Sequence, residues 1–134
     1  MGFIDNKVKK TFEKIFKGVA KEINCDVSEV KIGIVYKDGQ IVYEAYRGNE
    51  KEKDIKLSDY LNMFDSAPHV IEATIGQASG RYASEVATKL NKEVHPNDVS
   101  IIFKDVPGEI PRAVLMAFGQ KQREIDVKTE FSQS

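Results

Sequence analysis

The sequence predicts an α+β fold, a mostly antiparallel sheet of about four to six strands with an N-terminal amphipathic helix and one or two further helices packed on one face. Three observations carry this prediction. Apolar residues recur at helical spacing from Phe3 to Ile23, alternating β-branched and aromatic residues flank Asp38-Gly39, and strand-like runs follow residue 99. An Asp-Gly pair supplies the positive φ angles of a tight hairpin turn. We therefore expect antiparallel strands with helices before and between them.

Length and composition indicate a globular protein. The chain has 134 residues, of which 41% are hydrophobic and 31% charged, with a formal net charge of -1 and a pI near 6.1. We expect a single domain over residues 1–134, with a frayed tail after about residue 131. The composition is typical of a soluble protein without a membrane-spanning run. Because the net charge is close to zero, binding of nucleic acid or lipid would need a local charged patch.

The residues that carry chemistry are sparse. Cys25 is the only cysteine, which excludes an internal disulfide and a metal cluster built from cysteines. His69 and His95 have no second histidine or cysteine at metal-ligand spacing. No two carboxylates stand out as a general acid/base pair. We therefore expect a reducing, cytoplasmic location and no catalytic residues, metal or cofactor.

The N-terminal stretch combines an apolar stripe with a basic one. The apolar stripe consists of Val8, Phe12, Ile15, Val19 and Ile23, and the basic stripe of Lys7, Lys10, Lys14, Lys17 and Lys21. A row of lysines is able to follow a phosphate backbone or an anionic surface. Any amphipathic helix needs a solvated face, however, and no aromatic residue interleaves with the lysines to stack on bases. Polyanion binding is therefore an alternative to a purely structural helix, and nucleic acid is not the favoured partner.

A polar stretch and a short segment with helical spacing follow the first hairpin. Residues 48–56, "GNEKEKDIK", show no periodicity and predict a solvated connection after the hairpin. Leu57, Tyr60, Leu61 and Phe64 then indicate a short helix. It should end before Pro68, because the residue preceding a proline disfavours the helical conformation.

Residues 67–93 have two interpretations. As one helix they place Ala73, Gly76, Gly80, Ala83 and Ala87 on a small-residue stripe, which would let another helix approach closely. Against this, "HVIEATI" is rich in β-branched residues, and each glycine costs a helix interior about 1 kcal/mol. We favour the second interpretation, a strand from His69 to Ile75, a "GQASG" loop and a helix from Arg81.

The favoured interpretation would create an anion-binding corner. The unpaired amides and the dipole of a helix N-terminus attract negative charge, and an arginine adds donors suited to phosphate or carboxylate. The candidate ligand-binding residues are Gly76, Gln77, Ser79, Gly80 and Arg81. The motif matches neither a dinucleotide fingerprint nor a P-loop, so a structural corner without a ligand remains the alternative.

The C-terminal third predicts three strands. Val99 to Asp105 indicates a buried strand, Arg112 to Phe118 a strand or a helix that starts at Pro111, and residues 123–131 an alternating strand. Lys21 to Ile41 and Lys92 to Ile110 also resemble each other. The resemblance indicates either a duplicated helix-strand-strand unit or two corners with similar turn chemistry.

These observations favour a non-catalytic interaction or assembly protein, acting through protein–protein contacts as a homo-oligomer or as a subunit of a larger complex. Either the apolar strand 112–119 or the small-residue helix stripe would pair with another copy. The first alternative is a binding protein for an anionic or nucleotide-like small molecule at Gly76 to Arg81. The second is a nucleic-acid or anionic-surface binder that uses the lysine stripe. No membrane partner is expected.

Overall fold

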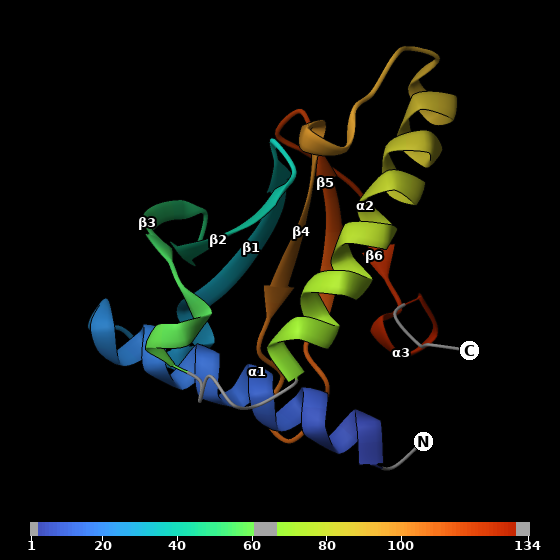
Figure 1. Ribbon diagram of the computed structural model, residues 1–134. Coiled ribbons are helices and arrows are strands. Elements are labelled where there is room, and N and C mark those ends of the chain that lie inside the picture. The colour runs from blue at the N-terminus through green and yellow to red at the C-terminus, as the bar shows by residue number, and fades with distance from the viewer. Residues whose placement is uncertain (1–2, 61–66, 131–134) are drawn as a thin grey trace.

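The computed structural model describes residues 3–60 and 67–130, which form a six-stranded sheet with helices (Figure 1). The helices are α1 (Phe3–Glu22), α2 (Ala67–Leu90) and α3 (Val127–Glu130). Short 3-10 helices lie at η1 (Val27–Glu29), η2 (Leu57–Asp59) and η3 (Pro96–Asp98). The strands are β1 (Val30–Lys37), β2 (Gln40–Arg47), β3 (Glu50–Ile55), β4 (Val99–Lys104), β5 (Arg112–Ala117) and β6 (Gln120–Ile125). The predicted α+β class is confirmed.

All neighbouring strands are antiparallel, in the order β3-β2-β1-β4-β5-β6. The first hairpin turns at Asp38 and Gly39, whose φ angles of 51° and 79° are those that the Asp-Gly pair predicts. Strand β5 lies inside the sheet between β4 and β6. The expectation that strand 112–119 pairs with another copy is therefore wrong, because both of its edges are already hydrogen-bonded.

The chain is built from two halves with the same order of elements. A long helix, a 3-10 turn and a three-stranded meander occur first as α1-η1-β1-β2-β3 and again as α2-η3-β4-β5-β6. The strand registers also correspond, since Val35 pairs with Val42 where the second half pairs Lys104 with Arg112. Each half has a register shift between its second and third strands. The resemblance within the sequence therefore marks two copies of one architecture.

The core lies between the helices and one face of the sheet. Its largest side chains with almost no exposed surface include Phe16, Phe103 and Ile15. The rings of Phe12 in α1 and Phe103 in β4 are 4.7 Å apart, so the helix of the first half packs on a strand of the second. This contact joins the two halves into one core, which is typical of a single cooperative domain.

Residues 67–90 form one continuous helix, so the favoured strand-loop-helix interpretation is wrong. The α2 side chains Ile75, Ala78, Tyr82 and Val86 are all at most 2% exposed and belong to the core. Burying an apolar side chain contributes about 1.5 to 3 kcal/mol, so this face outweighs the roughly 2 kcal/mol that two glycines cost. Tertiary packing has overridden local propensity.

Residues 50–55 form the edge strand β3, where a solvated connection was expected. The charged residues gave no strand pattern in the sequence, because an edge strand needs few apolar residues. Charges on an edge strand also protect it from pairing with other chains. Lys53 lies toward the helices and forms an ion pair with Glu22, while only Ile55 is buried. The short helix expected next is limited to η2, and Leu61 and Phe64 lie outside the described residues.

The last predicted strand, residues 123–131, is shifted toward the C-terminus, because β6 already begins at Gln120. Strand β6 ends at Ile125, and α3 begins at Val127. The carboxylate of Asp126 accepts hydrogen bonds from the backbone amide and the hydroxyl of Thr129, at 3.4 and 2.9 Å. An aspartate in this position satisfies free amides at a helix start, so the alternation through residue 127 does not continue the sheet. Phe131 lies outside the described residues.

Candidate functional site

The predicted anion-binding corner does not exist in the structure. Gly76, Gln77, Gly80 and their neighbours lie inside α2, so their amides serve the helix and are not free for a ligand. Ser79 is 4% exposed, and its hydroxyl donates a hydrogen bond of 2.8 Å to the carbonyl oxygen of Ile75. The geometry on which the small-molecule hypothesis depended is therefore missing.

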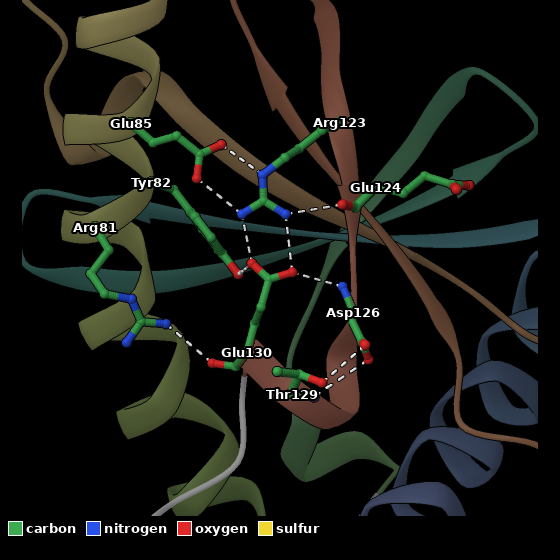
Figure 2. A network of polar contacts seen from close by, with 8 residues as sticks. All are labelled: Arg81, Tyr82, Glu85, Arg123, Glu124, Asp126, Thr129 and Glu130. Carbon is green, nitrogen blue, oxygen red and sulfur yellow. Dashed lines mark hydrogen bonds and ion pairs between the residues drawn. The ribbon is translucent and has the colours of Figure 1, made fainter.

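Arg81, the remaining residue of that corner, contacts the C-terminal helix instead. Its guanidinium donates a hydrogen bond of 3.1 Å to the carbonyl oxygen of Glu130, at the end of α3 (Figure 2). A cation near the last carbonyls of a helix is a common stabilising contact. Arg81 thus has a structural partner within the chain.

The same region contains a network centred on Arg123 of β6 (Figure 2). Its guanidinium bonds both carboxylate oxygens of Glu85 at 2.6 and 2.9 Å, and those of Glu130 at 2.6 and 3.0 Å. Tyr82 donates a further hydrogen bond of 3.0 Å to Glu130. The hydrogen bond from Arg123 lowers the pKa of Glu130 to about 2, against the opposing effect of burial. The network therefore fastens β6 to α2 and α3.

The first half contains an equivalent cluster of polar contacts. This correspondence indicates that the network belongs to the architecture that the two halves share. Lys53 of β3 stands opposite Ala45 as Arg123 of β6 stands opposite Leu115. The Lys53 ammonium pairs with Glu22 of α1. Tyr60, just after η2, donates a hydrogen bond to the same carboxylate. In each half, a cation of the third strand is held by the preceding long helix, and the element that follows the strand joins the cluster.

The two glycines of α2 face open space. A Cβ atom added at Gly76 or Gly80 would meet no heavy atom within 4 Å. No helix therefore packs closely on the small-residue stripe within residues 3–60 and 67–130. Ala83 of that stripe is 3% exposed and faces inward, whereas Ala73 is exposed. The glycines lower helix stability without a compensating contact inside the described chain.

Replacing Gly76 or Gly80 with alanine should consequently stabilise the protein by about 0.5 to 1 kcal/mol each, because alanine loses less backbone entropy in a helix. Chemical denaturation followed by circular dichroism measures this change. The control is Gly18→Ala in α1, where a Cβ would collide with the ring of Tyr60 and should destabilise the fold. Destabilisation by both α2 substitutions would contradict the open surroundings of these glycines.

The lysine stripe lies on the solvent-facing side of α1, as the sequence predicts. Lys10, Lys14, Lys17 and Lys21 are exposed, whereas Lys7 is placed only by its backbone in the same helix. The stripe contains no aromatic residue and borders none of the described hollows. It remains a candidate polyanion contact on charge alone.

The geometry bears on two kinds of reactive site, a metal centre and a cysteine nucleophile. Within residues 3–60 and 67–130, no group of three or more histidine, cysteine, aspartate or glutamate side chains is placed to hold a metal ion. Cys25 is half-buried, and burial raises the pKa of its thiol, with Glu29 adding to the effect. A raised pKa disfavours the nucleophilic thiolate.

The face of the sheet that points away from the helices, called the open face, carries an unexpected apolar patch. The described helices lie on the other side of the sheet (Figure 1). On the open face, Ile102 stands opposite Val114, Ser100 opposite Met116, and Val35 opposite Val42. The apolar patch lies on the four adjacent strands β2, β1, β4 and β5. It consists of Val42, Ile102, Val114 and Met116, which are partly exposed, and Val35, which is only 8% exposed.

Comparison of equivalent positions in the two halves shows which face of the sheet needs particular side chains for folding. At equivalent positions facing the helices both halves keep apolar residues, such as Ile32 and Ile101 or Ile55 and Ile125. On the open face the equivalent positions differ. The first half has Lys31, Gly33, Val35, Val42, Glu44 and Tyr46 where the second has Ser100, Ile102, Lys104, Arg112, Val114 and Met116. The shared architecture does not require the side chains of the open face, so they are the candidate functional residues.

A buried carboxylate lies beside the apolar patch. Glu44 is 7% exposed, and its side chain accepts a hydrogen bond of 3.2 Å from the Tyr46 hydroxyl. The Lys51 ammonium is 2.9 Å from the same carboxylate. The Tyr46 ring also covers Gly33, where a Cβ would come within 2.9 Å of it. The Glu44 carboxylate therefore has hydrogen-bond and ion-pair partners within the chain. The cluster borders the apolar patch on the side of β3.

Three cations form a line across the three adjacent strands β1, β4 and β5, at one end of the open face. Lys31 of β1 stands directly opposite Lys104 of β4, which stands directly opposite Arg112 of β5. We call these three residues the cation row. Like charges opposite each other in a sheet are destabilising. The chain nevertheless places the three cations together, and Lys104 and Arg112 lie two residues along their strands from Ile102 and Val114.

Sequence reasoning missed the open face, although a signal was present. Strands with apolar residues on both faces appear in a sequence as continuous apolar runs, and "IIF" and "AVLMAF" are such runs. The sequence predicts a buried strand for the first run and either a strand or a helix for the second, and neither prediction assigns side chains to a second, uncovered face. Which of their residues face away from the helices depends on the register and on where the helices pack.

Comparison with protein families, with curated proteins and with solved structures finds no match to this chain. None of the described helices is long and apolar enough to cross a membrane.

Proposed function

We propose that this chain is a non-catalytic interaction domain and a subunit of a larger complex, binding another protein through the open face of its sheet. The observation that carries the proposal is the apolar patch, which spans four strands on the side away from the core. The side chains of Val42, Ile102, Val114 and Met116 are all partly exposed. Contiguous apolar surface on a folded domain is typical of a protein contact, because its burial on binding is favourable.

The differences between the halves support the same function. Apolar residues that face the helices recur in both halves, whereas the residues at equivalent positions of the open face differ. An apolar area across four strands with charged neighbours resembles the centre and rim of a protein interface. A small-molecule site would instead be concave. The hollow lined by Lys31, Arg47 and Lys104 is at the end of the sheet and also contains Glu29, Glu50 and Glu52.

Site-specific photocrosslinking tests this proposal. A photoreactive amino acid at Met116 should capture a partner protein in extracts of the source cells, whereas the same group at exposed Gln77 on α2 should not. Adding Val114→Glu should reduce capture about tenfold or more, because an unpaired carboxylate buried in an apolar contact costs at least about 1.4 kcal/mol. Equal capture from both positions would argue against the open face as the interface.

A further inference from the structure

The composition of the open face restricts what can bind there. From the cation row of Lys31, Lys104 and Arg112, we infer that the partner is an acidic polypeptide segment whose carboxylates lie next to apolar side chains. This inference rests on the proposed function and names the chemistry of the partner at the same face.

The cation row keeps its charge available for a partner. Lys31 donates a hydrogen bond of 3.2 Å to the side-chain oxygen of Asn49, which is neutral. Arg112 pairs with Glu124 at 3.3 Å, but the two side chains are 68% and 56% exposed. Exposed ion pairs contribute little and exchange readily. Within the described residues Lys104 forms no ion pair.

The apolar and basic parts adjoin in a fixed spacing. Ile102 lies two residues from Lys104 along β4, and Val114 two residues from Arg112 along β5. Two residues of a strand span about 6.6 Å, so each cation is one side chain away from an apolar neighbour on the same face. A matching segment therefore presents carboxylates and apolar side chains side by side, which supplies both charge complementarity and apolar burial.

A second copy of the chain fits this face poorly. A two-fold contact brings the same patch of both copies together. The cation row lies at one end of the open face, and Lys37 at the other end of β1. A two-fold axis parallel to the strands would place the cation row opposite the cation row, and an axis perpendicular to them would bring it toward Lys37. Nucleic acid fits less well too, because the apolar patch is aliphatic and offers no aromatic ring on which bases could stack.

Titration with synthetic peptides tests the inference. The probe is a short peptide of glutamate and leucine, compared with versions that carry lysine for glutamate or serine for leucine, and with single-stranded oligothymidylate. The acidic apolar peptide should bind best, with an affinity that falls as salt rises. Its NMR shift changes should map to β1, β4 and β5.

Matched charge reversals locate the binding. Replacing Lys31, Lys104 and Arg112 with glutamate should weaken peptide binding about tenfold or more, whereas Lys10→Glu, Lys14→Glu and Lys17→Glu in α1 should leave it unchanged at the same net charge. If the first triple variant unfolds, Lys104→Gln with Arg112→Gln gives the same comparison with less perturbation.

Equal losses in both triple variants, or tighter binding of oligothymidylate than of the peptide, would overturn the inference. Concentration-dependent dimerisation through Met116 crosslinks would also overturn it, in favour of a second copy. The proposed function is judged separately. If a partner is captured at Met116 but charge reversal in the cation row does not weaken its binding, only the inference of an acidic segment is refuted. If no partner is captured, the proposed interface itself is refuted.

Discussion

Leu115→Ala should destabilise the protein by about 3 kcal/mol, whereas Val114→Ala should cost about 1 kcal/mol or less. The two residues are neighbours in β5, but Leu115 is 0% exposed in the core and Val114 is partly exposed on the open face. Removing a buried leucine loses its transfer free energy and leaves a cavity. Removing a partly exposed valine loses less area, and water fills the space. The pair therefore measures whether the open face contributes to folding.

Urea unfolding followed by circular dichroism measures both values, provided that the slope with denaturant stays the same. The result also bears on function. If Val114→Ala leaves stability nearly unchanged but weakens capture at Met116, the apolar patch acts in binding and not in the core. Equal losses of stability would mean that the patch belongs to the folded core, which would contradict its role as an available surface.

Arg123→Ala should destabilise the protein by about 2 kcal/mol. Breaking a buried ion pair costs about 3 to 5 kcal/mol, and this value is reduced here because Arg123 is 36% exposed. The loss follows because the charges of Glu85 and Glu130 would no longer be neutralised by the guanidinium, although Tyr82 and the Asp126 amide would still donate hydrogen bonds to Glu130. The equivalent Lys53→Ala should cost less than about 1 kcal/mol, since both partners of that pair are about as exposed as a surface ion pair. Thermal or urea unfolding of both variants measures the contrast.

The same network predicts a pH dependence. The Arg123 hydrogen bond lowers the pKa of Glu130 from 4.5 to about 2 in the folded protein. A lowered carboxyl pKa stabilises the fold above the unfolded value, and this contribution is lost as the pH falls from about 4.5 toward 2. Stability should decline over that window in the unmodified protein and decline less in Arg123→Ala. Equal acid profiles for the two proteins would show that the pair is not coupled to folding.

Local patterns determined much of the fold before any contact was known. The helix over Phe3 to Ile23 follows from its apolar stripe, and the first hairpin follows from Asp38-Gly39, because both depend on residues close in sequence. The α+β class and the antiparallel sheet follow from these elements. The repeated architecture also left a trace in the two similar helix-to-strand segments.

Tertiary structure alone decided the rest. Whether Gly76 and Gly80 lie in a helix depended on the core that receives Ile75 and Tyr82, since their burial outweighs the local cost of glycine. Strand β3 exists because β2 offers it an edge, which its own charged residues do not signal. The cation row is assembled from three strands by register, and residues 31, 104 and 112 are too far apart in sequence to suggest it. The candidate surface depends on contacts between residues that are far apart in sequence. The pairing of the strands and the side of the sheet on which the helices pack decide which apolar side chains stay uncovered.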